Sequence, residues 1–221
     1  MKTPLTSLNA ILQVAAQKLK NSEDSFLSGA MEKANIQVRR MTAMINGFLN
    51  VSRLESAELL IEQQNFRLDA LVEEVIEETK LTVSSNRIGF HNCPPVYINA
   101  DRDKISSVIS NLLGNAVKYS PKDSRITVTC MAGGDRVIIS VRDKGMGIGA
   151  EDAKKVFDRY YRVQGAHGKH IAGFGIGLYL SAEIVKHHGG EIWVESELGS
   201  GSTFSFSLPL STPAAGDQGD G

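Results

Sequence analysis

The chain contains few residues that could cross-link it or hold a metal. Only 2 of its 221 residues are cysteine, and Cys93 and Cys130 do not form a Cys-x-x-Cys pair. We therefore expect two buried free thiols, as in a reduced compartment. No apolar run is long enough to span a bilayer or to act as a signal peptide, so this part of the chain is expected to be cytoplasmic, without membrane contact.

An excess of charge of either sign is also missing. The 24 lysines and arginines nearly balance the 25 aspartates and glutamates, which leaves a formal net charge of -1. Such a balance supplies no field that would hold a nucleic-acid backbone, so no nucleic-acid partner is expected. The hydrophobic share of 42% and the charged share of 22% are ordinary for a soluble globular protein.

The first zone, residues 1–56, carries two helical seams. Apolar or small residues recur there at alternating spacings of three and four: Leu5, Leu8, Leu12, Ala15 and Leu19, then Leu27, Met31, Ala34, Val38, Met41, Ile45, Phe48 and Ser52. Residues 21–25 interrupt the pattern, and Ser22 can cap the second helix. The zone is predicted to be an antiparallel hairpin that forms a four-helix bundle with a second copy. The alternative is a hairpin packed on its own globular domain.

The second zone, residues 57–208, mixes strands and helices. We expect strands at 59–66 and 96–100, paired strands at 125–132 and 136–142, and further strands at 191–196 and 202–208. Helices are expected at 68–79, after a cap at Asp101, and at 174–188. This order predicts an α+β fold with helices on one face of a sheet. Residues 209–221 have little apolar surface to bury and are expected to be disordered.

Two asparagines and a lysine lie on one face of the helix expected after Asp101. Asn111, Asn115 and Lys118 are spaced four and three residues apart. Asparagine carbonyls are hard oxygen ligands suited to Mg²⁺, and a lysine can meet a phosphate as a point charge. The same pair of asparagines also fits a solvated helix surface.

Two glycine-containing segments are candidate nucleotide contacts. Asp143 to Ile148 reads DKGMGI directly after a strand, so its carboxylate could accept from an exocyclic amine such as that of adenine; a plain turn is the alternative. Gly173 to Leu178 reads GFGIGL at the start of a helix, where backbone N–H groups favour phosphate. A dinucleotide-binding motif fits poorly, because no strand immediately precedes these glycines.

The ordered set is more specific than any single motif. NLLGNAVKYS, DKGMGI, FDRYYR, GFGIGL and GSGSTF follow one another within about 95 residues, with the expected lid at 165–172. This arrangement closely resembles the N, G1, F, G2 and G3 boxes of bacterial sensor histidine kinases. Residues 1–56 resemble their dimerisation and histidine-phosphotransfer hairpin. The resemblance implies an α/β sandwich of the histidine kinase and gyrase type that binds ATP and Mg²⁺.

The resemblance also assigns roles to individual residues. Asn111 and Asn115 would hold Mg²⁺ and the phosphates, and Lys118 and Arg162 would act on the phosphates. The nucleotide would be bound by Tyr119, Asp143, Gly145, Gly147, Gly173, Gly175, Gly177 and Thr203. A response-regulator receiver domain would be the partner, in a homodimer whose longer parent could be membrane-anchored.

The phosphoacceptor histidine of the family has no counterpart among these residues. The family motif reads roughly His-Glu-x-x-Thr-Pro-Leu, and Thr3, Pro4 and Leu5 match its end. By that register the histidine falls two residues before Met1. We expect the chain to be a shortened kinase that does not phosphorylate itself, none of its five histidines being a substitute.

Two other functions remain as alternatives to the kinase. The first is a nucleotide-binding module that dimerises and docks a regulator without phosphotransfer. The second is an ATP-hydrolysing switch of the gyrase type. The second is disfavoured because related ATPases place a glutamate base where Asn111 stands, and asparagine cannot take a proton.

Overall fold

The chain divides into two compact units, residues 1–59 and 60–221. The structure, a computed structural model, describes residues 61–83, 87–91, 94–163 and 174–211, together with residues 11, 12, 14, 15, 27, 29, 31, 33–38, 41, 42 and 45. The expected tail is outside this set except for its first residues. No helix within it is long and apolar enough to cross a membrane.

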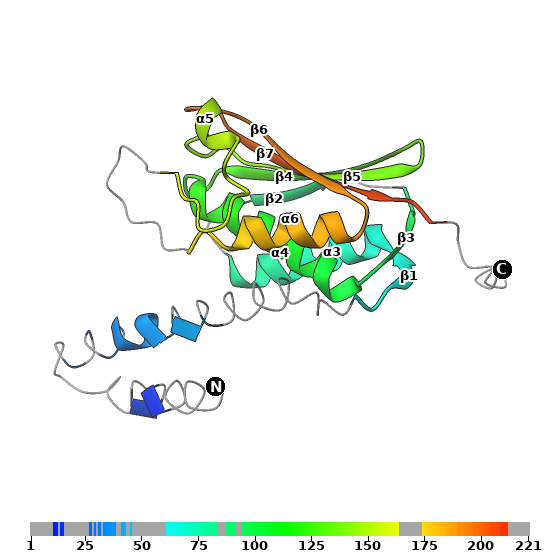
Figure 1. The fold of residues 1–221 in the computed structure, drawn as a ribbon. Coiled ribbons are helices and arrows are strands. Elements are labelled where there is room, and N and C mark those ends of the chain that lie inside the picture. Colours follow the sequence, from blue (N-terminus) through cyan, green and yellow to red (C-terminus); the bar gives the residue numbers. More distant parts are fainter. Residues whose placement is uncertain are drawn as a thin grey trace. The chain divides into compact units, whose positions relative to one another are not determined.

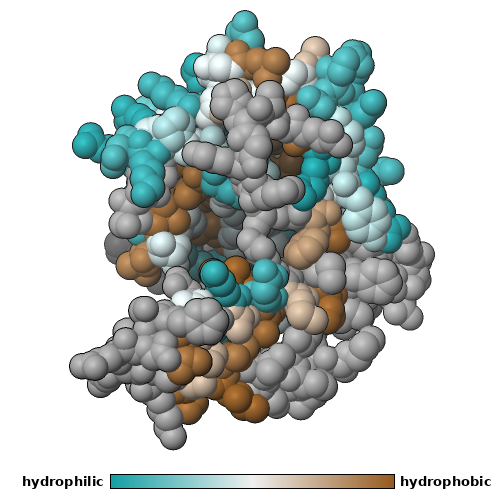
Figure 2. Space-filling view, turned by 90° about the vertical axis from the view of Figure 1, so that its left-hand side faces the viewer, coloured by the Kyte–Doolittle hydropathy of each residue, from teal (hydrophilic) through white to brown (hydrophobic). Residues whose placement is uncertain are grey.

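The described residues of the first unit are all helical. Val38, a predicted seam residue, is buried, and the seam residues Leu12, Ala15, Met31, Ala34 and Ile45 are half-buried. The seam residues Leu27 and Met41 are exposed, as are the apolar residues Ile11, Val14 and Ile36. Figure 2 shows hydrophobic residues on the surface of this helical unit. The remaining seam positions are outside the described residues, and the hairpin and the four-helix bundle stay predictions.

The second unit contains a five-stranded and a two-stranded sheet. In the larger sheet the order is β2 (Arg87–His91), β4 (Arg125–Gly133), β5 (Arg136–Arg142), β7 (Gly201–Pro209) and β6 (Glu191–Glu197). Only β2 and β4 pair in parallel within it. The smaller sheet joins β1 (Gln64–Arg67) to β3 (Tyr97–Ala100) in antiparallel.

Three helices cover one face of the larger sheet (Figure 1). They are α3 (Leu68–Thr82), α4 (Arg102–Tyr119) and α6 (Gly177–His187). Alternation along β5 sorts the two faces: Val137, Ile139 and Val141 are buried, whereas Ile138 and Arg142 are exposed. The predicted α+β fold with helices on one face is confirmed.

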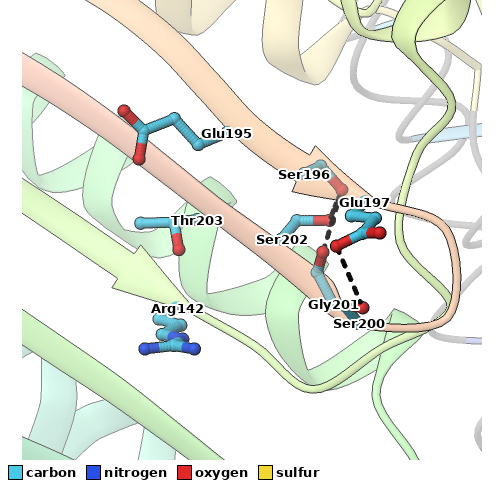
Figure 3. A pocket seen from close by; sticks show the side chains of 8 residues that line it. All are labelled: Arg142, Glu195, Ser196, Glu197, Ser200, Gly201, Ser202 and Thr203. Atoms are coloured by element: carbon cyan, nitrogen blue, oxygen red, sulfur yellow. Dashed lines mark hydrogen bonds between the residues drawn. The ribbon is translucent and has the colours of Figure 1, made fainter.

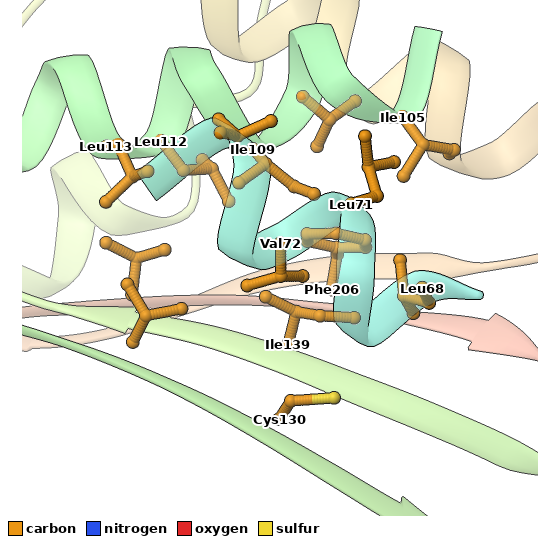
Figure 4. Close-up of a cluster of buried hydrophobic side chains, with 14 of the residues drawn as sticks. Leu68, Leu71, Val72, Ile105, Ile109, Leu112, Leu113, Cys130, Ile139 and Phe206 are labelled. Carbon is orange, nitrogen blue, oxygen red and sulfur yellow. The ribbon is translucent and has the colours of Figure 1, made fainter. Parts of the chain in front are cut away.

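The core lies between these helices and the sheet (Figure 4). Leu71, Ile109, Leu112, Ile139 and Phe206 are at most 1% exposed. The i, i+3, i+4 spacing of the apolar residues gives α3 and α4 one continuous buried stripe each. Burial of each large side chain contributes roughly 1.5–3 kcal/mol, so this layer fixes where the polar stripe of α4 points.

A buried junction links the start of α4 to the end of α6. As predicted, Asp101 caps α4: its side chain accepts from the Lys104 N–H at 3.1 Å, and it also accepts from the Glu62 N–H at 3.2 Å. The Asp101 N–H donates to His188 Nε2 at 3.0 Å, and His188 Nδ1 lies 2.7 Å from the Ile184 carbonyl oxygen. His188, the residue after α6, is thus linked to the N-cap of α4.

Several predicted element boundaries shift in the structure. The strand expected at 59–66 begins only at Gln64. The helix expected from Phe174 begins at Gly177, because Gly175 has a φ of 67°, in the left-handed region that a helix excludes. The short helix α5 (Ala150–Ala153) was not predicted.

The expectation of two free thiols is wrong, because Cys130 is disulfide-bonded. It lies on β4 and is 5% exposed. The neighbouring strand β2 runs parallel to β4 and ends at His91, opposite Thr129. The chain therefore leaves β2 directly beside Cys130, a proximity that spacing along the sequence does not reveal. Cys93 is outside the described residues.

Candidate functional site

The polar stripe of α4 forms one wall of the candidate site. Asn111 and Asn115 are half-buried one turn apart, and Lys118 follows on the same face, exposed. Leu112 and Ala116 are buried, which holds the helix by its opposite stripe. The Asn115 side chain makes no hydrogen bond with the described part of the chain. Its amide oxygen is thus available to a ligand.

Asn111 joins α4 to the beginning of α6. Its Nδ2 donates to Ser181 Oγ at 2.9 Å. Its Oδ1 lies against Gly177, so closely that a Cβ there would come within 2.5 Å of it. The structure therefore brings together the N-box asparagine and the last glycine of GFGIGL, where a larger residue would displace the Asn111 side chain.

Asp143 is buried at the end of β5, with 4% of its surface exposed. Its N–H donates to the Ser202 carbonyl at 2.8 Å, and its Oδ1 accepts from the Gly145 N–H at 2.6 Å. Burial raises the pKa of Asp143, and backbone N–H groups of Gly145 and Ser202 that donate to the carboxylate oppose the rise only in part. No described residue other than Gly145 and Ser202 donates to this carboxylate, so it can also accept from an outside donor.

Three glycines hold the Asp143 loop against its neighbours. A Cβ on Gly145 would lie 2.7 Å from the Tyr119 carbonyl oxygen, at the end of α4. Gly147 has a φ of 70°, and a Cβ there would lie 1.9 Å from the Glu197 carbonyl oxygen. A Cβ on Gly201 would lie 2.3 Å from the Asp143 carbonyl oxygen. The N, G1 and G3 segments thus meet through backbone contacts that any side chain would block.

Lys118 and Tyr119 stand at the exposed end of α4. Lys118 Nζ lies 3.3 Å from the Tyr119 hydroxyl and 4.8 Å from the centre of its ring. The ring is 40% exposed. Both residues therefore combine an accessible position with closeness to the Asp143 loop, which Gly145 packs against the Tyr119 carbonyl.

The FDRYYR segment runs beside the entry to α6. The Tyr160 N–H donates to the Gly175 carbonyl at 2.9 Å, and the Tyr161 hydroxyl lies 2.5 Å from Asp152 Oδ1. A Cβ on Gly175 would lie 2.5 Å from the Tyr161 carbonyl oxygen. Arg162 follows, exposed to solvent. Gly173 and the expected lid at 165–172, with its two histidines, are outside the described residues.

The structure does not bring Thr203 to Asp143. Thr203 pairs with Arg142 and Glu195, on the sheet face that the helices leave open. Ser202, 7% exposed, lies on the helix-covered side, and its carbonyl accepts from Asp143. The period-two pattern could have found this, because Phe204 and Phe206 alternate with Thr203 and must face the core.

A hollow lies at the ends of β5, β6 and β7 (Figure 3). The side chains of Arg142, Glu195 and Thr203 line it, together with the turn from Ser200 to Ser202. Ser196 Oγ bonds the Gly201 carbonyl and Ser202 Oγ, at 2.9 and 2.8 Å, which closes this turn. None of the α4 residues takes part, so this hollow is separate from the wall that carries Asn111 and Asn115.

A comparison with protein families identifies the family to which these site segments belong. Residues 100–212 match the model described as histidine kinase-, DNA gyrase B- and HSP90-like ATPase. The chain belongs to this ATPase family. Its matched region begins at the end of β3 and contains α4, the Asp143 loop, α6 and the β6–β7 hairpin.

Curated relatives place the chain among the sensor histidine kinases. It is 32% identical over 213 residues to the sensor histidine kinase WalK of Bacillus subtilis (strain 168), covering 95% of this chain and 35% of WalK. It is 34% identical over 215 residues to the adaptive-response sensory kinase SasA of Synechococcus sp. (strain JA-2-3B'a(2-13)), covering 95% of this chain and 56% of SasA. The chain thus spans about a third to a half of these relatives, and is identified as a sensor histidine kinase catalytic domain.

Solved structures agree on the fold. Full-length ShkA in complex with AMPPNP superposes with a TM-score of 0.74 and 24% identity, over 95% of this chain and 44% of ShkA. The catalytic domain of histidine kinase ThkA, in a nucleotide-free form, gives a TM-score of 0.58 and 28% identity, over 68% of this chain and 99% of that domain.

Proposed function

We propose that the chain binds Mg-ATP and donates the γ-phosphoryl group to a histidine, in the first step of two-component signalling. The observation that carries the proposal is the buried Asp143 carboxylate. No side chain among the described residues donates to it, and the wall of α4 that bears Asn111 and Asn115 lies beside its loop. A buried carboxylate is costly unless a donor reaches it, and the adenine amine supplies such a donor.

The phosphates would lie along the other end of the same wall. The N-terminus of α6 offers unpaired backbone N–H groups and the positive end of the helix dipole. Lys118, exposed one turn beyond Asn115, would meet a phosphate oxygen, and Arg162 would approach the γ-phosphate. Gly175 and Gly177 let the backbone turn closely there, since side chains would strike Tyr161 and Asn111. Gly173 would continue the same edge.

Mg²⁺ fits the donors on α4. Asn111 and Asn115 would hold it through amide oxygens, and the bound ion would neutralise charge on the phosphates. The Asn115 amide has no partner among the described residues, and Asn111 Oδ1 faces the α6 entry. Position 111 is an asparagine, where related ATPases have a glutamate that activates water. Because asparagine cannot take a proton, the site favours transfer to a docked histidine over hydrolysis.

The remaining parts of the proposal concern the whole protein. We infer that residues 1–56 form the hairpin of a homodimer, that residues 57–208 form the catalytic domain, and that a response-regulator receiver domain accepts the phosphoryl group. The site is cytoplasmic in this proposal, where ATP is available. A docking module without phosphotransfer is the alternative, and a test of labelling separates the two.

Titration calorimetry with AMPPNP and Mg²⁺ tests nucleotide binding. The chain is expected to bind the analogue, and Asp143→Asn should weaken binding by about 1–3 kcal/mol, because a charged acceptor in a buried hydrogen bond is lost. Asp135→Asn, in the exposed β4–β5 turn, is the matched control and should bind as the unmodified chain does. Equal affinity for Asp143→Asn and the unmodified chain would remove Asp143 from the site.

A further inference from the structure

Ser181 is a buried polar residue at the contact between α4 and α6. It is 2% exposed, and its hydroxyl meets the Asn111 amide nitrogen at 2.9 Å. Gly177 lies one turn earlier on the same face of α6, against Asn111 Oδ1. The Asn111 side chain therefore lies in a notch made by two small residues.

The two ends of the Asn111 amide meet different surroundings. Its nitrogen is bonded to Ser181, inside the helix contact. Its oxygen faces the first turn of α6, where unpaired N–H groups and the positive dipole end favour an electronegative atom. With the serine bond made, the amide oxygen stays beside Gly177, at the first turn of α6.

We propose that Ser181 is a positioning residue that fixes the Asn111 amide with its oxygen toward the metal ion. This inference rests on the proposed Mg-ATP function. A purely packing role would be met by alanine, since the neighbouring buried residues of α6, Ile184 and Val185, are apolar. The buried hydroxyl instead pairs with one of the two α4 side chains that the proposed metal site uses.

The Mg²⁺ dependence of AMPPNP binding tests this role. Ser181→Ala removes the hydroxyl and leaves the Asn111 amide free to turn over. The Mg²⁺ concentration that gives half-maximal AMPPNP binding should rise between about twofold and about tenfold, the range for one lost hydrogen bond. Ser107→Ala, on the exposed side of α4, is the matched control and should leave the Mg²⁺ dependence unchanged. Ser181→Thr keeps a hydroxyl and should restore most of the dependence.

A double-mutant cycle separates positioning from general loosening of the helix contact. In a chain that already carries Asn111→Ala, adding Ser181→Ala should change the Mg²⁺ dependence no further. An unchanged Mg²⁺ dependence for Ser181→Ala, or an equal effect in the Asn111→Ala background, would overturn the inference alone. Absence of AMPPNP binding by the unmodified chain at any Mg²⁺ concentration would overturn the proposed function, and this inference with it.

Discussion

At the scale of single residues, Asp143 is where binding and stability make opposite demands. Burial raises the pKa of its carboxyl above the usual 3.8, and the Gly145 and Ser202 hydrogen bonds reverse only part of that rise. A carboxyl with a raised pKa binds its proton more tightly in the folded chain. Its ionised form therefore lowers the free energy of unfolding at neutral pH, and this cost disappears as the pH falls through the folded pKa.

Without nucleotide, Asp143→Asn should melt at a higher temperature than the unmodified chain at pH 7. The amide removes a buried charge but keeps an oxygen for the Gly145 N–H. The difference should shrink as the pH is lowered toward 4, where the unmodified carboxyl takes up its proton. Thermal denaturation from pH 4 to pH 8 measures both effects, with Asp135→Asn as the control. A lower melting temperature at every pH would show that the carboxylate stabilises the loop instead.

Sequence patterns located much of the site residue by residue, but not how its members meet. Spacing alone put Asn111, Asn115 and Lys118 on one helical face, and the structure has them there. Thr203 was expected at the nucleotide, yet strand alternation places Ser202 on the side of Asp143. The Asn111–Ser181 bond joins residues 70 positions apart, a contact that no local pattern carries.

At the scale of secondary structure, Asp101 ties α4 to two other segments. Burial alone would raise the pKa of Asp101, but the Lys104 side chain and the N–H groups of Lys104 and Glu62 stabilise the carboxylate and lower the pKa below 3.8. A lowered pKa means that this carboxylate stabilises the fold above pH 4, and that the contribution is lost as the pH falls through the folded pKa. The junction thus supports both helices that flank the candidate site.

Asp101→Ala should lower the free energy of unfolding by about 0.5–2 kcal/mol at pH 7, the cost of a lost helix cap. The loss should diminish as the pH falls through the lowered folded pKa of Asp101, where the unmodified carboxylate takes up its proton. Chemical denaturation at pH 7 and pH 3 measures the difference in free energy of unfolding between the variant and the unmodified chain. Asp103→Ala, an exposed acid in the same first turn, should cost less. Equal losses for both variants would mean that the cap contributes nothing beyond the helix dipole.

The elements were predicted best where a physical start or stop signal exists. Three signals lie close to the observed ends of elements. Asp101 precedes α4, a short turn joins β4 to β5, and two glycines follow His188 after α6. The expected start at Phe174 lies three residues before the observed start of α6 at Gly177. Gly175 has a positive φ that a helix excludes, and the spacing of apolar residues does not predict this backbone conformation.

At the scale of the whole molecule, the helical unit should hold two copies together. Several of its apolar side chains are exposed in the single chain, among them Val14 at 56% and Met41 at 48%. A dimer is expected at tens of micromolar, because burial of such residues from two copies outweighs the cost of association. Replacing Leu12 and Met41 by glutamate should give monomers that still bind AMPPNP. Sedimentation measures the association state of the unmodified chain and of the variant. An unmodified chain that sediments as a monomer would favour a hairpin folded on its own domain.

The central claim is that this ATP site donates to a histidine rather than to water. The most direct test uses the chain preceded by His and Glu, which restores the family motif before Thr3, incubated with γ-labelled ATP and Mg²⁺. We expect an acid-labile, base-stable label on the added histidine, and no such label on the chain without it. An extended chain that binds AMPPNP yet stays unlabelled, or a label on any of the five histidines already present, would contradict the claim.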